Sequence, residues 1–420
     1  MGHVPHLLLQ LAVILATARA LAFVLARIGQ PPVIGEMIAG IVLGPIVLGA
    51  LAPGAHAWLF PHDKIAALEG LSQIGLVLFM FVVGAEMRAP AGARRRIVAA
   101  GWVGTLGVML PMALGLAIAP ILHSHFAPAG VGFWPFALFM AASMAITAFP
   151  VMARILKEQA LTRTPLGQLS LASAAIADAL AWIMLAFVVA LISSHGGWTL
   201  FASTMVGLVA MAALGFGLVR PLFAKILARH APDGRPTGAV LSMLMIGMCV
   251  MAAATEWLGL HPVFGAFLFG ACLPRDDRLA AHFAKAFEPV SMLVLMPVVF
   301  ALAGLGTTPD AFVGAGTGAF ALVLVVAVAG KVLGGTLGAR WSGHGWRDSF
   351  AVGARGNARG LMELVVLKIG LDAGLVGREL FTMLFGMAIV TTMMTSPMLA
   401  LCMRGARSKL PARDGVDSAS

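Results

Sequence analysis

Asp178 is a single carboxylate inside the long apolar run of residues 170–186, which contains no basic residue. An ionised acid at the centre of a lipid bilayer costs about 3 kcal/mol or more, so acids in such runs are candidates for ion or proton sites. A carboxylate oxygen is a good ligand for a hard cation, and the same oxygen can take a proton instead. The residue type and its surroundings therefore make Asp178 the first candidate for a site that binds a cation or a proton.

Further polar residues in apolar surroundings are candidates for the same site. Thr147 stands three residues before Pro150, which removes a backbone donor and frees groups near the threonine. Ser173 is a weak candidate, because it lies about one and a half helical turns before Asp178. Asn357 could be an ion ligand or could cap a half-helix. Glu36 and Glu363 could contact the ion directly or form a network with Arg355 or Arg359.

Composition indicates the elements that must position these residues. Hydrophobic residues make up 60% of the 420 residues, charged residues make up 11%, and the mean hydropathy is +0.96, which excludes a soluble globular domain. The apolar runs have the length that crosses a bilayer as a helix. They predict an all-α polytopic membrane protein of about thirteen spans, near residues 5–27, 32–51, 66–86, 96–122, 132–156, 165–193, 198–221, 238–258, 260–273, 286–305, 311–339, 348–371 and 375–403.

The positions of the basic residues test this count and predict the topology. Lys and Arg concentrate in cytoplasmic loops, and with the N-terminus outside and the C-terminus inside most of the 28 Lys and Arg residues fall in inner loops. Only Lys64 and Arg378 fall in outer loops. The net charge of +10 is thus a topology signal, with a possible attraction to anionic lipid, and it does not indicate a nucleic-acid partner.

A short repeat predicts the architecture of the membrane domain. The pattern Pro-Val-Ile-Gly at 32–35 followed by Gly40 recurs as Pro-Val-Phe-Gly at 262–265 followed by Gly270. The copies lie seven spans apart, so they would cross the membrane in opposite directions, as in inverted-repeat transporters. Spans 1–6 and 8–13 would then be the repeats, with span seven as the linker. Chance similarity in a chain with 49 glycines is the alternative explanation.

The same symmetry pairs two spans that are both interrupted. The span at 132–156 contains Pro150, and the span at 348–371 contains the polar, glycine-rich segment 353–360. Irregular backbone at membrane depth is tolerated only around a cavity or inside the protein. We therefore expect two broken helices that cross at the midplane and direct freed carbonyls and half-helix dipoles at a substrate site.

Four motifs carry a resemblance to a known family. They read QPPVIGEMIAGIVLGP at 30–45, TAFPVMARILKE at 147–158, AAIADALAW at 174–182 and NARGLMELVVLKIGLD at 357–372. With these motifs in this order, the chain resembles the monovalent cation:proton antiporter-2 family over about residues 10–403. Within that family it most resembles the Kef-type and plant cation/H⁺-exchanger branch. The resemblance implies a homodimer that exchanges Na⁺ or K⁺ for H⁺ by an elevator-like motion of a core domain against a dimerisation domain.

The resemblance also assigns roles to residues of this chain. Asp178 matches the family's ion-binding aspartate, Thr147 the threonine at the first helix break, and Lys331 the intramembrane lysine. The family usually has Asp, Asn or Gln before the binding aspartate, whereas this chain has Ala177. A lysine without that acidic partner is easier to deprotonate, which favours electrogenic exchange of two protons for one cation over a one-for-one electroneutral cycle.

The remaining expectations concern class, partners and location. We expect no enzyme, since no Ser-His-Asp or His-Glu-x-x-His spacing is present, and no cofactor or metal beyond the transported monovalent cation. The sequence predicts one membrane transporter domain at 1–404 with interleaved core and dimerisation subdomains, a short cytoplasmic tail at 405–420 and no soluble regulatory domain. The resemblance implies the inner (cytoplasmic) membrane of the cell. The alternatives are a sodium-coupled symporter of an organic anion and a Kef-type K⁺ efflux system.

Overall fold

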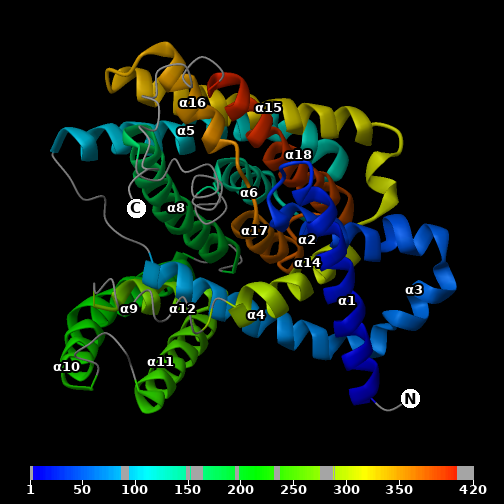
Figure 1. Ribbon diagram of the computed structural model, residues 1–420, viewed down its shortest axis with the longest axis horizontal. Coiled ribbons are helices and arrows are strands. Elements are labelled where there is room, and N and C mark those ends of the chain that lie inside the picture. The colour runs from blue at the N-terminus through cyan, green and yellow to red at the C-terminus, as the bar shows by residue number, and fades with distance from the viewer. Residues whose placement is uncertain are drawn as a thin grey trace, which may run out of the picture.

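Helices joined by short turns build the part of the chain that the computed structural model describes, which is residues 3–86, 94–147, 152, 164–193, 198–230, 237–274, 287 and 289–403. No strand occurs among these residues, so the all-α prediction is confirmed. The first helices are α1 (His3–Ala26), α2 (Pro32–Leu43), α3 (Pro53–Leu59), α4 (Ile65–Glu86), α5 (Arg94–Phe126), α6 (Phe133–Ala145) and α8 (Pro165–Ser193) (Figure 1).

The second half of the chain repeats this all-helical pattern. Its helices are α9 (Trp198–Leu214), α10 (Arg220–His230), α11 (Gly238–Trp257), α12 (Pro262–Cys272), α14 (Met296–Leu305), α15 (Gly316–Trp341), α16 (Trp346–Gly356), α17 (Leu361–Asp372) and α18 (Arg378–Met403). Short π-helical turns extend α2 through η1 (Pro45–Gly49), join α9 to α10 through η3 (Gly215–Val219) and precede α14 as η4 (Ser291–Leu295). Pro150 and the predicted tail at 405–420 lie outside the described residues.

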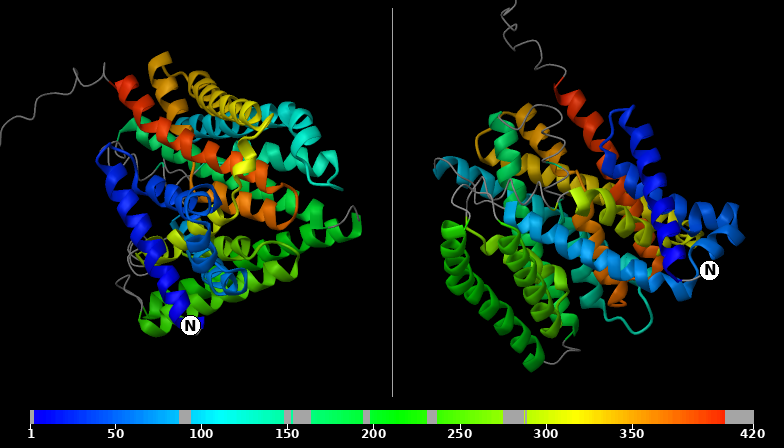
Figure 2. Two further views of the ribbon diagram at one scale, coloured as in Figure 1. Left: turned by 90° about the vertical axis from the view of Figure 1, so that its right-hand side faces the viewer. Right: turned by 60° about the horizontal axis from the view of Figure 1, so that its bottom comes forward.

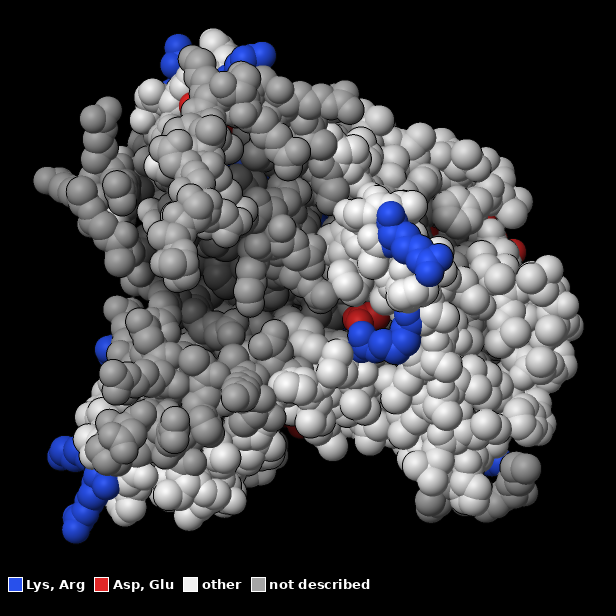
Figure 3. Space-filling model, in the orientation of Figure 1, with Lys and Arg blue, Asp and Glu red and all other residues white. Residues whose placement is uncertain are grey.

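Several helices are long and apolar enough to cross a membrane. The described residues contain seven such helices by length and composition, together with three shorter apolar ones at Phe133–Ala145, Pro262–Cys272 and Ser291–Leu305. On the face drawn in Figure 3, Lys and Arg side chains (blue) occupy only a few places. Most of the described surface on this face is white, which marks residues other than Lys, Arg, Asp and Glu. An integral membrane protein follows from these features, while the count of thirteen spans stays a prediction.

A first packing group consists of α1–α4, α9–α12 and α14. Helices α2 and α12 both begin with a proline at the first helical position, where its missing N–H costs nothing. Each of these helices packs tightly through its repeated glycines, because a Cβ at Gly40 would meet the Phe300 carbonyl of α14 and a Cβ at Gly270 would meet the Phe81 carbonyl of α4. The two copies of the sequence repeat therefore make corresponding helix contacts.

A second packing group consists of α5, α6, α8 and α15–α18. Helices α5 and α15 lie side by side in the three ribbon views (Figures 1 and 2). Gly330, Gly334 and Gly338, one helical turn apart on α15, allow this approach, because a Cβ on each would meet the backbone of α5. Small residues at such a spacing let membrane helices pack backbone to backbone. The second group carries every predicted site residue except Glu36.

Two interruptions occur in the second packing group. Helix α6 ends at Ala145, where Ile146 is already extended with φ −65° and ψ 138°. The chain between α16 and α17 is non-helical at Asn357–Gly360 and becomes helical again at Leu361. The sequence predicted a break over 353–360, and the helix in fact continues through Gly356. In the predicted span at 132–156, the residues after Thr147 lie outside the described residues, except for Met152.

Candidate functional site

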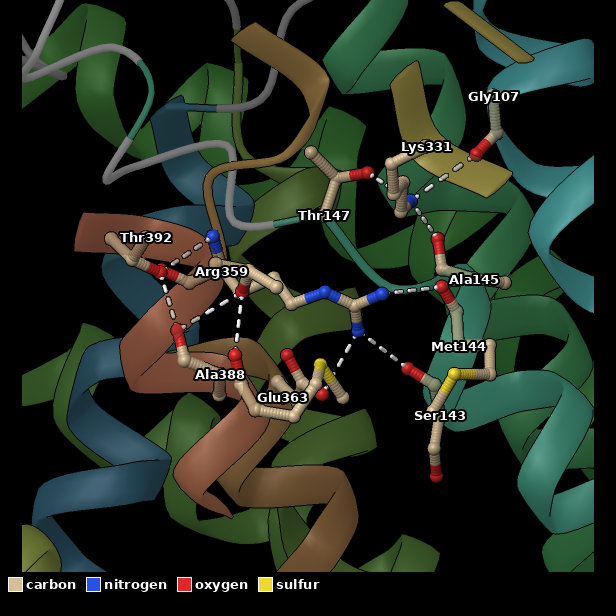
Figure 4. A network of polar contacts seen from close by, with 12 residues as sticks. Gly107, Ser143, Met144, Ala145, Thr147, Lys331, Arg359, Glu363, Ala388 and Thr392 are labelled. Atoms are coloured by element: carbon tan, nitrogen blue, oxygen red, sulfur yellow. Dashed lines mark hydrogen bonds and ion pairs between the residues drawn. The ribbon is translucent and has the colours of Figure 1, made fainter. Parts of the chain in front are cut away.

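Lys331 lies at the centre of the first interruption. Its side chain is fully buried on α15, and its ammonium group donates hydrogen bonds to three oxygens (Figure 4). These oxygens are the Gly107 carbonyl of α5 at 3.2 Å, the Ala145 carbonyl at the end of α6, and the Thr147 hydroxyl at 2.6 Å. The structure thus brings together Thr147 and Lys331, which the sequence placed in one site.

The local backbone explains why these oxygens are available. The last carbonyls of a helix have no intrahelical donor, and α6 ends abruptly because the chain turns extended at Ile146. The Ala145 carbonyl is one of these terminal groups. It carries part of the negative end of the helix dipole, which favours a cation there. An ammonium group is the cation that occupies this position in the structure.

A small cavity of about 30 Å³ lies next to Lys331. It is lined by Gly107, Thr147, Ser173, Ala177 and Lys331, among other residues. The Ser173 hydroxyl donates to the Ser170 carbonyl at 2.9 Å, so its oxygen lone pairs remain available as acceptors. Ala177 contributes only a methyl group to the wall of this cavity.

Asp178 follows Ala177 on α8 and is 2% exposed. Its carboxylate is one of three charged groups that act electrostatically on the Lys331 ammonium group, and the weakest of them, after Arg359 and Glu363. The fold brings Thr147 and Lys331 into contact, although they lie 184 residues apart in the sequence, and Asp178 directly follows the cavity-lining residue Ala177. A carboxylate, a hydroxyl and a carbonyl are the oxygen ligands that a hard monovalent cation requires.

Arg359 lies at the second interruption and is completely buried. Its guanidinium group donates to the Ser143 carbonyl at 3.0 Å and to the Met144 carbonyl at 2.9 Å, both near the end of α6, and it forms an ion pair with Glu363 at 2.9 Å (Figure 4). Glu363 lies in the first turn of α17, where a negative charge is favourable. Arg359 therefore ties the two interrupted helices together.

Helix α18 holds the backbone of the second interruption. The Thr392 hydroxyl accepts from the Arg359 N–H at 3.0 Å and lies 2.8 Å from the Arg359 carbonyl and 2.7 Å from the Ala388 carbonyl, to which it can donate. The Asn357 side chain donates to the Thr391 carbonyl at 3.0 Å. Asn357 thus binds α18 through its NH₂ group, while its carbonyl oxygen has no hydrogen-bond partner among the described residues.

Sequence reasoning missed Thr392 and the carbonyl groups of Gly107, Ser143 and Met144. Carbonyl groups carry no signature in a sequence, so only the fold could identify them. The three threonines Thr391, Thr392 and Thr395 within the apolar run 375–403 were a usable signal. All three are buried, and their hydroxyls bond to backbone carbonyls.

Glu36 lies on α2 in the first packing group. Its carboxylate forms an ion pair with Arg19 of α1 at 3.3 Å, and Arg19 also donates to the Leu293 carbonyl at 3.2 Å. The structure therefore provides a structural partner for Glu36 that joins α1 to α2. The expected network of Glu36 with Arg355 or Arg359 stays a prediction.

Comparisons with known proteins agree with these features. Residues 12–403 match the family described as sodium/hydrogen exchanger, transmembrane. The chain is 37% identical over 395 residues to the Na⁺/H⁺ antiporter NhaS4 of Synechocystis sp., covering 94% of this chain and 96% of that protein. It is 35% identical to cation/H⁺ antiporter 17 of Arabidopsis thaliana and 31% identical to K⁺/H⁺ antiporter 1 of Saccharomyces cerevisiae. The resemblance inferred from the motifs is confirmed.

The share of each relative that is matched differs. The chain spans nearly all of the cyanobacterial protein but about half the length of the plant and yeast relatives, 48% and 49%. Among solved structures, the sodium proton antiporter MjNhaP1 from Methanocaldococcus jannaschii at pH 8 matches with a TM-score of 0.60 and 15% identity, over 95% of this chain and 99% of that chain. This similarity shows a shared fold.

Proposed function

The chain belongs to the sodium/hydrogen exchanger family of transmembrane proteins, and from that premise we propose that it is a secondary antiporter that exchanges Na⁺ or K⁺ for H⁺. Family membership supports a transporter as opposed to an enzyme. The relatives include a Na⁺/H⁺ antiporter and a K⁺/H⁺ antiporter by name, so their names support the exchange and leave both ions as candidates.

The single observation that carries the proposal is the position of the Lys331 ammonium group. It is held by the Ala145 carbonyl and the Thr147 hydroxyl, and the buried carboxylate of Asp178 acts on it electrostatically. A monovalent cation without its water shell needs a similar set of oxygens at a similar distance. We infer that the transported cation binds at this interruption, with Asp178 and Thr147 as its side-chain ligands.

A site of this kind couples the two fluxes. Ionised Asp178 can hold the cation, and protonated Asp178 is neutral, so either form can change sides. A bare buried carboxylate is costly in a low-dielectric medium, and the empty, charged form therefore crosses rarely. Exchange follows, because a cation that leaves must be replaced by a proton before the site returns.

The packing of the helices supports an elevator-like motion. The second packing group is held together by close glycine contacts between α5 and α15 and by the bonds of Arg359 and Thr392. Helix contacts within each packing group are more extensive than those between the groups. We propose that the second group carries the site across the membrane as one body, while the first group forms the scaffold and the contacts of a homodimer in the inner membrane.

Lys331 and Ala177 bear on the number of protons that are exchanged for each cation. With alanine at 177, no carboxylate at that position stabilises the Lys331 ammonium group in the cavity. We propose that a cation entering the site displaces this ammonium group, which then releases its proton. Two protons would exchange for one cation, and the cycle would be electrogenic.

The test is proton movement driven by Na⁺, K⁺ or Li⁺ in everted membrane vesicles that contain the wild-type protein or Asp178→Asn. The variant should abolish the cation-dependent pH change for every ion. Asp372→Asn is the matched control, because it removes a half-exposed carboxylate at the end of α17 and should leave exchange near the wild-type rate. Wild-type activity in Asp178→Asn would refute the proposed ligand.

A second readout tests whether one site binds both ions. If the cation and the proton compete for Asp178, lowering the pH should raise the apparent KM for the cation and leave the maximal rate nearly unchanged at saturating cation. An apparent KM that is independent of pH would indicate separate sites. Comparison of the three ions in the same vesicles identifies the substrate.

A further inference from the structure

Three exposed tryptophans lie where α5, α15 and α16 meet. Trp102 of α5, Trp341 of α15 and Trp346 of α16 are 46%, 63% and 65% exposed. They lie near the start of α5, at the end of α15 and at the start of α16. The topology predicted from the basic residues places these helix ends on the inner side of the membrane. We call these three residues the inner tryptophan cluster.

The cluster has a defined geometry. The rings of Trp102 and Trp341 meet edge to face with centroids 5.6 Å apart. The Arg340 guanidinium group lies over the Trp346 ring at 5.4 Å from its centroid and donates to the His344 carbonyl at 3.2 Å. The cation and the aromatic rings are therefore held together at the turn between α15 and α16.

Two basic residues adjoin these tryptophans in the chain. Arg340 precedes Trp341 and Arg347 follows Trp346, and both are exposed. Asp348 is the acidic residue of the same turn, and it lies in the first turn of α16, where the helix dipole favours it. Figure 3 shows Lys and Arg side chains at the upper edge of the molecule, where Figure 1 has α16.

Exposed tryptophans elsewhere have different neighbours. Trp134 at the start of α6 contacts Phe133, Trp58 of α3 contacts His6, and Trp257 at the end of α11 is 87% exposed. The topology places these residues on the outer side. In the described part of the chain, Trp346 is the tryptophan with an arginine over its ring. Tryptophan at both membrane interfaces is common, so the arginines are what distinguishes the inner cluster.

We propose that the inner tryptophan cluster, with Arg340 and Arg347, binds the headgroup of an anionic phospholipid in the inner leaflet. The arginines bind the lipid phosphate, because a guanidinium group matches phosphate oxygens in shape and charge. The tryptophan rings pack against the glycerol and the upper acyl chains, as amphipathic rings do at the headgroup level. The charge of the surface is complementary to the anionic lipid that covers it.

The consequence concerns the helices that carry the proposed ion site. The bound lipid holds together the inner ends of α5, α15 and α16, and these helices provide Gly107, Lys331 and the entry to the second interruption. Anionic lipid should therefore stabilise the second packing group. This inference requires the inner-side topology but not the antiport activity, so the two can fail separately.

The test is lipid retention by the purified full-length chain, measured by native mass spectrometry with phosphatidylglycerol or phosphatidylcholine added to the detergent. The wild type should retain phosphatidylglycerol in preference to phosphatidylcholine. The double variant Arg340→Gln/Arg347→Gln should retain about 25-fold less phosphatidylglycerol, because each basic side chain at an anionic surface contributes a factor of about five. Both side chains are exposed, so the variant should fold.

The matched control is Arg229→Gln, which removes an exposed arginine at the end of α10, on the same predicted side but away from the cluster. Its retention of phosphatidylglycerol should stay within about twofold of the wild type, since general attraction to one charge is weak in salt. Unchanged retention in the double variant, an equal loss in Arg229→Gln, or equal retention of both lipids by the wild type would each overturn the proposal.

Discussion

The two helix interruptions use the same kinds of groups in different ways. At the first, the ammonium group of Lys331 bonds to three oxygens from α5 and the end of α6, beside a cavity. At the second, Arg359 bonds to two carbonyls of α6 and to Glu363, and α18 binds its backbone. Both sites place a buried cation against the end of α6.

The difference lies in how firmly each cation is held. Arg359 has a planar fork of donors that is bonded to three partners, which favours a structural role. Lys331 is a compact point charge on a flexible stem, and it lines a small cavity. We therefore propose that the second interruption braces the structure while the first exchanges its cation.

The largest effect on stability should come from the second interruption. Arg359→Met should lower the free energy of unfolding by about 3–5 kcal/mol, because it leaves Glu363 buried without its partner and two carbonyls of α6 without donors. Thermal unfolding in detergent measures this. The double variant Arg359→Met/Glu363→Met should recover part of the loss. If Arg359→Met were as stable as the wild type, Arg359 would not stabilise the second interruption.

The next effect is on coupling at the first interruption. Lys331→Gln retains an amide donor toward the Thr147 hydroxyl but cannot release a proton, so exchange should become electroneutral. In proteoliposomes, the ratio of exchange rates with and without an imposed membrane potential should fall to about one. Lys368→Gln, which alters a surface lysine paired with Asp372, should keep the wild-type ratio. A voltage dependence that persists in Lys331→Gln would exclude Lys331 as the second proton carrier.

A smaller effect on affinity should come from Thr147. Thr147→Val removes a hydroxyl ligand at nearly constant volume, and the apparent KM for the cation should rise about tenfold, since a hydrogen-bonding or ligand group contributes roughly 1–2 kcal/mol. Thr147→Ser keeps the hydroxyl and should stay within about threefold of the wild type. Equal KM values in the valine and serine variants would show that the hydroxyl is not a ligand.

The smallest effect should come from Thr392. Thr392→Val removes the hydroxyl that bonds both backbone groups of Arg359, and it should lower the free energy of unfolding by about 1–2 kcal/mol. Because this bond belongs to the brace, the apparent KM for the cation should not change. A rise in KM like that of Thr147→Val would mean that the two interruptions are not separate in function.

Local sequence was sufficient to predict several features of the two interruptions. The glycine-rich segment 353–360 marked the second interruption to within a few residues, because glycine weakens a helix. Glycine and proline do not end a helix by themselves, since Pro111 and Pro120 lie inside α5 and Gly353 lies inside α16. Asp178 was identifiable because a charge in an apolar run is costly. Lys331 was identified through the family resemblance. That Lys331 is the electrostatic neighbour of Asp178 stays a prediction.

The bonds across the fold were not predictable from local sequence. Arg359 finds its acceptors on α6, more than two hundred residues earlier, and the sequence offered Glu36 and Glu363 as equal partners. The structure pairs Glu363 with Arg359 and Glu36 with Arg19. Both are acids in apolar spans, and only the packing of α1, α2 and α17 distinguishes them.

The most direct test is cation-dependent thermal stabilisation of the purified protein, because it measures binding without transport. Saturating Na⁺ or K⁺ should raise the unfolding temperature of the wild type and of Thr392→Val by the same increment at high pH. The increment should be smaller in Thr147→Val and absent in Asp178→Asn. An increment that survives in Asp178→Asn, or that is lost in Thr392→Val and kept in Thr147→Val, would contradict the assignment of the first interruption as the cation site.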